Sequence, residues 1–285
     1  MPPMRIVLTN DDGIDAPGIA ALYEVIQDLG EVHVVAPASV QSATSHAVTF
    51  HKPIRVEHRR GGERKPGHPW GTDASPSEGH AAEHAAQRDA LCSVPGYAVD
   101  GRPADCVKLA LTALFPDGVD MVISGMNAGA NVGINVIYSG TVAAAREASF
   151  VGVPAMAVSL HVGAWSKIRW RDAARFARQA IDKAMTLPCD RHAVVNINVP
   201  VLDDRAQPAG IRVLPLSTSP LRDSYEKIDN GDGSFSYRVN ESMAFRESQP
   251  GTDVHAIYDG YTTITPLHFD LTHGPQMQQF ELHGK

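Results

Sequence analysis

Short apolar runs alternate with amphipathic stretches along the chain, and this alternation predicts parallel strands joined by helices. Residues 4–9 (Met-Arg-Ile-Val-Leu-Thr) form an apolar run that is bounded by turn residues, as expected of a buried strand. Apolar residues then recur at helical spacing as far as Leu29, and Glu31–Ala36 has the pattern of a second strand. Strand, helix and strand within this length predict a right-handed βαβ unit and therefore a parallel sheet.

The same alternation continues to about residue 200 and then changes. Further strands are predicted over Asp120–Ser124, Val153–Leu160 and Val194–Val199, and helices from Pro103, over Ser139–Ala148 and over Trp165–Met185. Beyond Pro200, short extended pieces are separated by turns, and Asn230–Gly233 has the composition of a hairpin turn. We expect an α/β core over residues 1–200 and an antiparallel hairpin region over 201–285.

One segment inside the core lacks any sustained period. Between residues 59 and 95, Gly, Pro, Glu, Arg and His are interleaved, which predicts a mobile surface insertion. His80 and His84 stand four residues apart there, a spacing that suits metal ligands on a helix. With no third ligand nearby, exposed loop histidines are the favoured interpretation.

Composition narrows the class of protein. The 285 residues carry a formal charge of −7, and no basic run is long enough to favour polymeric nucleic acid as a partner. The three cysteines stand far apart, which argues against a disulfide framework and against a zinc site. No run is apolar enough to cross a bilayer and no leader pattern precedes the first strand, so we expect a cytoplasmic protein that does not contact membranes.

Two adjacent acids, Asp11 and Asp12, follow the first strand directly. The carboxyl end of a strand in an open α/β sheet is where ligands bind, and a divalent cation is the simplest way to satisfy two neighbouring carboxylates. Gly13 permits a sharp turn and Pro17 suits the first turn of a helix. A solvated Asx-turn that merely caps the loop explains this stretch alone equally well.

Other oxygen donors are expected at the same edge. Ser42 lies in the loop after the second strand, and Asn127 and Asn131 lie in a loop of alternating glycine and asparagine. The helix that begins near Ser139 offers free amide groups for a phosphate, although a plain serine N-cap explains that motif as well. Carboxylate, hydroxyl and carboxamide oxygens suit Mg²⁺ or Mn²⁺, which predicts a metal-assisted phosphomonoesterase.

The sequence also resembles a known family, the stationary-phase survival protein SurE, a group of metal-dependent 5′/3′-nucleotidases. The matching stretches are Asn10–Gly13 with Ala16–Gly18, Val34–Pro37 followed by Ser42, Tyr97–Gly101 with Pro103 and Asp105–Val107, Ser124–Gly129 with Asn131 and Gly133, Tyr138–Ala143, and Thr252–Asp253 with Gly260–Tyr261 and Thr265–Leu267. They span most of the chain in the order of the family.

The resemblance implies a site and a substrate class. It implies that Asp11, Asp12, Ser42 and Asn127 hold one divalent metal ion (Mg or Mn) per subunit, with Asp11 and Asp12 as the catalytic residues, and that Asn10, Asn131, Ser139, Gly140 and Thr141 surround the phosphate. It further implies a Rossmann-like fold with a C-terminal hairpin exchanged between subunits, hence a homodimer or homotetramer. The implied substrates are nucleoside monophosphates, with short polyphosphate in some members.

Three departures from the family pattern bear on the site. Residues 38–41 are Ala-Ser-Val-Gln where the family usually carries Asp-Arg-Asn-Arg, so charges that would bind phosphate are missing. Arg102 stands in place of a usual threonine and is expected to restore positive charge in part. The insertion over residues 59–95 is longer than the family leads us to expect.

Rival interpretations fit the sequence less well. A haloacid-dehalogenase phosphatase would need a nucleophilic aspartate where this chain has Asn10, and an amide cannot form an aspartyl-phosphate. A nucleotide-binding module without turnover remains the alternative, although no GxGxxG follows the first strand. His46 is placed to donate a proton to a leaving group, but a loop or core histidine is the favoured interpretation. Attack by water activated by the cation, oriented in part by Asp12, is the predicted mechanism.

Overall fold

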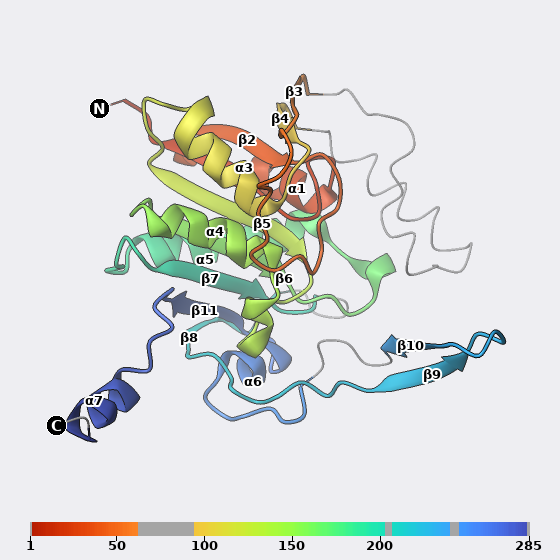
Figure 1. The fold of residues 1–285 in the computed structure, drawn as a ribbon. Helices are drawn as coiled ribbons and strands as arrows, with labels where there is room; N and C mark the ends of the chain where they lie inside the picture. The colour runs from red at the N-terminus through yellow and green to blue at the C-terminus, as the bar shows by residue number, and fades with distance from the viewer. Residues whose placement is uncertain (1, 62–93, 203–206, 240–244, 284–285) are drawn as a thin grey trace.

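A mostly parallel sheet forms the centre of the protein, which we describe from a computed structural model covering residues 2–61, 94–202, 207–239 and 245–283. In these ranges nine strands pair in the order β3-β4-β2-β1-β5-β6-β7-β11-β8 (Figure 1). The strands are β1 (Arg5–Thr9), β2 (Glu31–Pro37), β3 (Val56–Arg59), β4 (Gly96–Val99), β5 (Met121–Ala128), β6 (Ala155–Leu160), β7 (Val194–Val199), β8 (Ile211–Val213) and β11 (Thr262–Leu267). The predicted α/β class and parallel core are confirmed.

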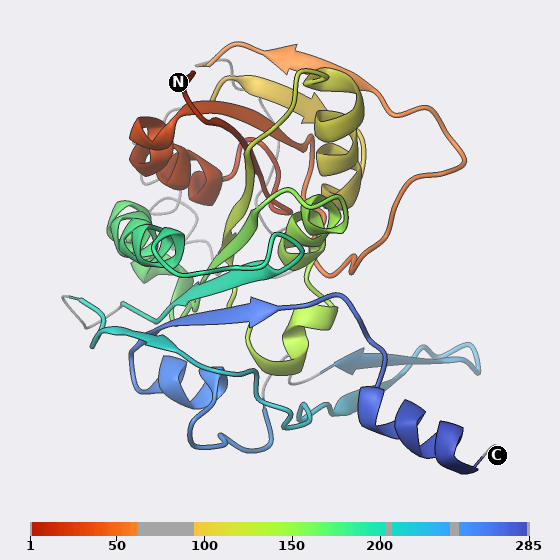
Figure 2. The ribbon, with the colours of Figure 1, turned by 90° about the vertical axis from the view of Figure 1, so that its left-hand side faces the viewer.

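Helices cover both faces of this sheet. Helices α1 (Pro17–Ile26) and α5 (Trp170–Met185) lie on one face, and α3 (Pro103–Leu109) and α4 (Gly140–Phe150) lie on the other (Figure 2). Alternate residues of each strand therefore enter different cores. In β1, Ile6 and Leu8 pack toward α1 and α5, whereas Val7 packs toward α3 and α4.

Two element boundaries and one short strand differ from the sequence-based expectation. The helix expected from Trp165 begins instead at Trp170, after a short 3₁₀ turn, η4 (Trp165–Lys167). Strand β5 continues through Asn127 to Ala128, a stretch that was expected to be loop. The short antiparallel strand β3 was not predicted, because its Val-Glu-His-Arg sequence has no apolar alternation.

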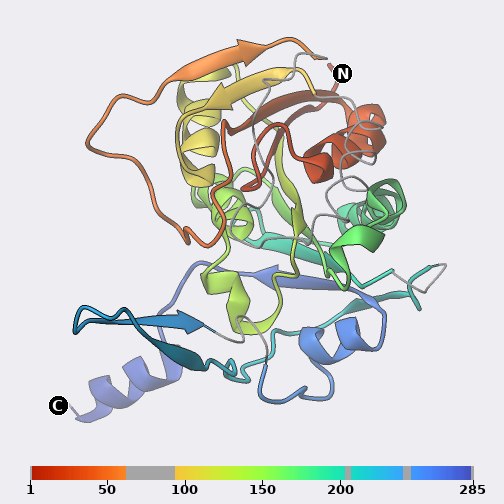
Figure 3. The same cartoon turned by 90° about the vertical axis from the view of Figure 1, so that its right-hand side faces the viewer.

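The C-terminal region is more closely tied to the sheet than expected. The predicted hairpin is present as β9 (Tyr225–Asp229) and β10 (Phe235–Val239), and Figure 3 shows it extending away from the sheet. However, β11 pairs with β7 and β8 pairs in parallel with β11, so the expectation of a wholly antiparallel appendage was wrong for these strands. Two helices, α6 (Asp253–Tyr258) and α7 (Gly274–His283), were not predicted.

In the ranges given above, no helix combines the length and apolar character that a membrane span requires. Most of the expected insertion, including His80 and His84, lies outside the described residues.

Candidate active site

Asp11 and Asp12 lie in a buried turn directly after β1. Their exposed fractions are only 4% and 7%. The turn is held by Asn10, whose side-chain amide donates to the Gly13 carbonyl at 2.8 Å and whose oxygen accepts from the Gly13 amide at 3.1 Å. Gly13 has a φ of +95°, which favours glycine. The Asx-type turn and a buried acidic pair are therefore both present, and neither excludes the other.

Asp11 contacts two other loops at this edge of the sheet. The Thr141 hydroxyl donates to Asp11 Oδ1 at 2.6 Å, and the Gln41 amide donates to the Asp11 carbonyl at 2.7 Å. A Cβ atom added to Gly140 would lie 2.9 Å from Asp11 Cβ, so the start of α4 approaches Asp11 as closely as a residue without a side chain allows.

Asp12 contacts the end of β5. Its Oδ2 accepts a hydrogen bond from the Ala128 amide at 3.2 Å. The neighbouring Asn127 donates its side-chain amide to the Gly129 carbonyl at 2.6 Å, and this leaves its side-chain oxygen as an acceptor. The structure thus brings segments that are more than a hundred residues apart to the same pair of acids.

Few neighbouring groups balance the negative charges of the Asp11 and Asp12 carboxylates. Burial raises the pKa of Asp11, and hydrogen bonds from Thr141 and from the backbone offset this only in part. Burial raises the pKa of Asp12 well above its ordinary range, and the neighbouring charge of Asp11 raises it further. No basic side chain of the described residues pairs with either acid. Strongly perturbed acids in such a turn mark a functional-site candidate.

These residues fit a hard divalent cation. Asp11 accepts hydrogen bonds from the Thr141 hydroxyl and from backbone amides, and Asp12 accepts one from the Ala128 amide, but neither carboxylate pairs with a basic side chain of the described residues, so both keep a charge that a cation would balance. Within the described ranges, no three His, Cys, Asp or Glu side chains gather, so neutral oxygens would have to complete the set. Two carboxylates with hydroxyl, carboxamide and water oxygens suit Mg²⁺ or Mn²⁺.

The loop that carries Ser42 is anchored beside this turn. Ser42 is exposed and follows Gln41, the residue bonded to Asp11. Further along, Ser45 donates its hydroxyl to the Ile137 carbonyl at 2.8 Å, just before α4. The loop is therefore held on both sides of Ser42, and this supports its expected position near the acids.

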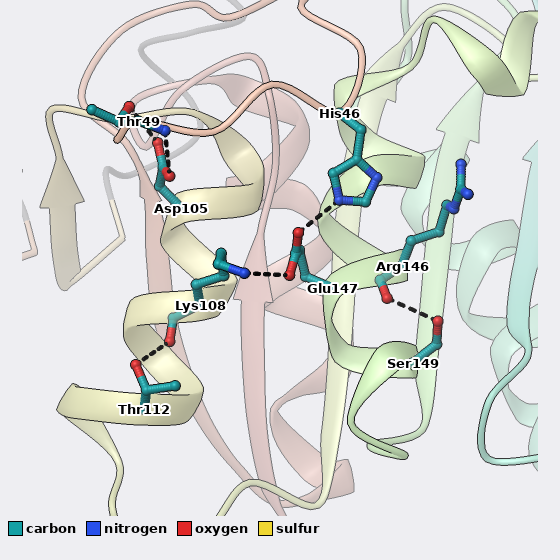
Figure 4. A network of polar contacts seen from close by, with 8 residues as sticks. All are labelled: His46, Thr49, Asp105, Lys108, Thr112, Arg146, Glu147 and Ser149. Carbon is teal, nitrogen blue, oxygen red and sulfur yellow. Dashed lines mark hydrogen bonds and ion pairs between the residues drawn. The ribbon is translucent and has the colours of Figure 1, made fainter. Parts of the chain in front are cut away.

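Two buried acids on α3 and α4 fix the rest of that loop (Figure 4). Asp105 accepts from the Thr49 amide at 3.0 Å and from its hydroxyl at 2.7 Å, so the expected structural role of Asp105 is confirmed. Glu147 accepts from His46 at 2.7 Å and from Lys108 at 3.2 Å. His46 thus serves as an anchor of the loop, in line with the structural interpretation favoured above.

The Glu147 contacts predict a pH-dependent contribution to stability. Burial alone would raise the pKa of Glu147, but the hydrogen bonds from His46 and Lys108 outweigh it, and the net pKa is lower than 4.5. Because the pKa of Glu147 is lower in the folded than in the unfolded protein, its ionised form stabilises the fold at pH values above the unfolded pKa. This stabilisation is lost as the pH falls through the folded pKa. We expect Glu147→Gln to cost about 1–3 kcal/mol of unfolding free energy at pH 7. In thermal unfolding, this difference from the wild type should disappear well below pH 4.5.

The control for this measurement is Glu226→Gln. The Glu226 side chain is 56% exposed and lies 4.0 Å from Arg238. Such a contact contributes little, so this substitution should leave the melting temperature nearly unchanged at every pH. A Glu147→Gln difference that stayed constant down to pH 3 would contradict the assignment.

Asn131 lies in a buried cluster of amides that sequence reasoning missed. Its backbone amide donates to Asn198 at 2.8 Å and its side chain donates to Ser159 at 2.8 Å, while its carbonyl accepts from Asn196 at 2.7 Å. The cluster holds the loop after β5. The signal was present in β7, where asparagine occupies alternate positions of an otherwise apolar strand.

The residues expected to surround a phosphate differ in whether their hydrogen-bonding groups are already used within the protein. Thr141 is fully buried and gives its one hydroxyl proton to Asp11, so it orients that carboxylate and has no proton left for a phosphate. Ser139 is the N-cap of α4 and accepts from the Val142 amide at 3.1 Å. Its own hydroxyl proton stays available, as does the Gly140 amide at the start of the helix, whereas the Thr141 backbone is bonded to Asp11. The side chain of Asn10 is used by the turn.

A cavity of about 660 Å³ lies elsewhere, between α4 and strands β8 and β11. Its lining is mainly aliphatic and includes Arg146 and His268, and it contains neither Asp11 nor Asp12. This cavity has no carboxylate in its lining to hold a cation, so the acidic turn remains the candidate site.

Buried carboxylates at the carboxyl edge of a parallel sheet, facing a helix N-terminus, define a doubly wound α/β protein with an acidic ligand site. Comparison with known proteins gives the family. The model of the family described as "Survival protein SurE" matches residues 6–223, and the chain belongs to that family.

Individual relatives agree with this assignment. The chain is similar to a protein named 5'-nucleotidase SurE from Pelotomaculum thermopropionicum, with 39% identity over 94% of this chain and 91% of the relative. A protein of the same name from Heliobacterium modesticaldum is 37% identical over 97% of this chain and 90% of the relative. The crystal structure of the SurE protein from Aquifex aeolicus superposes with a TM-score of 0.75 at 29% identity, covering 98% of this chain and 99% of that one.

Proposed function

We propose that this protein is a metal-dependent phosphomonoesterase that hydrolyses nucleoside 5′- or 3′-monophosphates to nucleoside and phosphate. The observation that carries the proposal is the pair of adjacent buried acids, neither of which pairs with a basic side chain of the described residues. Relatives named 5'-nucleotidase support the substrate class.

In this proposal Asp11, Asp12, Ser42 and Asn127 hold one Mg²⁺ or Mn²⁺ ion. Asp11 is oriented by the Thr141 hydroxyl, and Asp12 by the Ala128 amide. The cation supplies charge that polarises a phosphoryl oxygen and lowers the pKa of a water molecule. The chain contributes fixed positions for these ligands, which avoids reorganisation when charge develops on the phosphoryl group.

The phosphate is expected to lie at the start of α4. The Ser139 hydroxyl and the Gly140 amide are donors, and the positive end of the helix favours an anion. The loop carrying Asn131 is fixed by its buried amide cluster. Asn10 and Thr141 support the site from behind, as a turn residue and as a partner of Asp11.

Release of phosphate tests this proposal. Metal-stripped protein should release no phosphate from a panel of nucleoside monophosphates, and added Mn²⁺ or Mg²⁺ should restore release, because the acidic pair lacks a countercharge without a cation. A colorimetric phosphate assay with each metal and substrate gives the measurement. Binding of the nucleotides without turnover under every metal would favour the alternative, a nucleotide-binding module.

We also propose that the hairpin of β9 and β10 associates with another copy of the chain. Its aromatic side chains are exposed, with exposed fractions of 64% for Tyr225, 52% for Phe235 and 63% for Tyr237. Aromatic side chains on an extended two-stranded arm suit an interface between subunits. Sedimentation analysis of the whole chain gives the subunit number directly, with a homodimer or homotetramer expected.

A further inference from the structure

Arg102 lies at the point where three elements of the candidate site meet. It is the N-cap residue of α3, and its backbone amide donates to Asp105 Oδ2 at 2.8 Å. The next residue, Pro103, is 3.2 Å from the position that a Gly140 Cβ would take, and that position is 2.9 Å from Asp11 Cβ. The Arg102 side chain therefore begins beside the acidic turn.

The guanidinium of Arg102 reaches across to the loop beside Asp11. Its Nη1 donates to the side-chain oxygen of Gln41 at 2.6 Å, and the backbone amide of Gln41 donates to the Asp11 carbonyl. Gln41 is in turn held by Ser39, which accepts its side-chain amide at 3.2 Å. These contacts hold the positive charge of Arg102 against the loop that carries Ser42.

The partner of Arg102 is neutral, unlike the partners of other basic side chains nearby. Arg59 forms an ion pair with Asp15 at 2.5 Å, and Lys108 forms one with Glu147 at 3.2 Å. Among the described residues, Arg102 faces no carboxylate within ion-pair distance and donates its side chain to an amide. The hydrogen bond to Gln41 has a charge on the donor only, whereas an anion would bring the opposite charge and could accept two parallel guanidinium hydrogen bonds, so an anion would displace Gln41.

Charge balance indicates which anion fits. Two ionised acids and a divalent cation leave the site close to neutral, and a phosphomonoester adds about −1.5 to −2 at pH 7. A guanidinium offers a planar pair of donors that matches two phosphoryl oxygens. We propose that Arg102 exchanges Gln41 for the phosphoryl group of the substrate and selects dianionic phosphomonoesters over monoanionic phosphodiesters; this rests on the proposed function.

Binding of inorganic phosphate tests the proposal without requiring turnover. In calorimetry with Mn²⁺ present, Arg102→Gln should bind phosphate about 10- to 100-fold more weakly than the wild type, and Arg102→Lys should lose less. The backbone bond to Asp105 survives both substitutions, so the melting temperature should stay nearly constant. Arg55→Gln is the control, because the Arg55 side chain is 78% exposed and pairs with Glu57.

A double substitution tests whether phosphate binding depends on a positive charge at this position or is lost because the substitution disturbs the structure. Because the tips of residues 41 and 102 are 2.6 Å apart, Gln41→Arg combined with Arg102→Gln places a guanidinium at nearly the same point. This variant should regain most of the lost phosphate affinity. Failure to regain it, or wild-type affinity in Arg102→Gln, would overturn the role of Arg102, as would a wild type that binds no phosphate.

Selectivity gives an independent readout. The ratio of kcat/KM for p-nitrophenyl phosphate to that for bis-p-nitrophenyl phosphate should fall about tenfold or more in Arg102→Gln, with KM for the monoester affected more than kcat. An unchanged ratio would overturn the selectivity claim. If the wild type binds phosphate but turns over no ester, the proposed hydrolase function fails, and the calorimetric comparison still decides the role of Arg102.

Discussion

Replacing Asp11 by asparagine is expected to abolish most turnover while leaving the fold as stable as before, or more stable. The amide oxygen of asparagine can still accept the Thr141 hydroxyl, which donates at 2.6 Å in the wild type. The substitution removes a buried carboxylate that repels Asp12. Burial already disfavours the charged form of this carboxylate, because it raises the pKa of Asp11. Loss of a charged ligand should lower kcat/KM roughly 10³-fold. Phosphate-release kinetics and thermal unfolding in metal-free buffer measure the two effects.

Asp100→Asn is the matched control for this substitution. Asp100 follows β4 near the same edge of the sheet, but its side chain is 64% exposed and pairs with Lys52. We expect its activity and its melting temperature to match those of the wild type. Near-normal turnover in Asp11→Asn, or a fall in stability as large as that of a core cavity, would contradict the assignment of Asp11 as a ligand.

Gly140→Ala should have the second largest effect on activity. The added Cβ would lie 2.9 Å from Asp11 Cβ and 3.0 Å from Asp11 Oδ2, distances at which one of the two elements must move. Displacement of a catalytic group by about 1 Å can cost about 10²-fold in rate. We expect a loss of that order in kcat/KM, measured with the same phosphate assay, together with weaker Mn²⁺ binding.

Gly274→Ala provides the comparison for Gly140→Ala. Gly274 is the first residue of α7, as Gly140 is of α4, and nothing lies within 4 Å of the Cβ that alanine would add there. Alanine favours a helix more than glycine does, so this variant should be active and slightly stabilised. If both variants kept full activity, the close approach of α4 to Asp11 would have no catalytic importance.

Much of the fold was predictable because it follows from local patterns. Apolar runs such as that of β1, which ends at Thr9, identify buried strands without any tertiary information. The pieces that escaped prediction have weak local signals. Strand β3 is short and polar. The sequences of β8 and β11 predict extended segments, but they do not indicate whether these segments join the central sheet. Their place depends on contacts that arise only in the folded chain.

In the candidate site, too, some features follow from local sequence patterns and others depend on contacts formed only in the folded chain. The location of Asp11 and Asp12 beside other loops was predictable because parallel strands end at a common edge, which brings their loops together. The particular pairings were not, because they join segments far apart in sequence. Thr141 and Asp11 are 130 residues apart, and His46 and Glu147 are 101 residues apart. Sequence reasoning anticipated that Arg102 adds positive charge, but only the structure shows that it contacts Gln41.

The central claim is that one divalent cation, held by oxygens from separate loops, serves phosphoester hydrolysis. The most direct test is a titration of metal-stripped protein with Mn²⁺ while phosphate release from a nucleoside monophosphate is followed. The account predicts that activity rises from zero and reaches its maximum at one equivalent of Mn²⁺ per chain, and that Asp11→Asn and Asp12→Asn show no such rise. Full activity without added metal, or an undiminished rise in both variants, would contradict it.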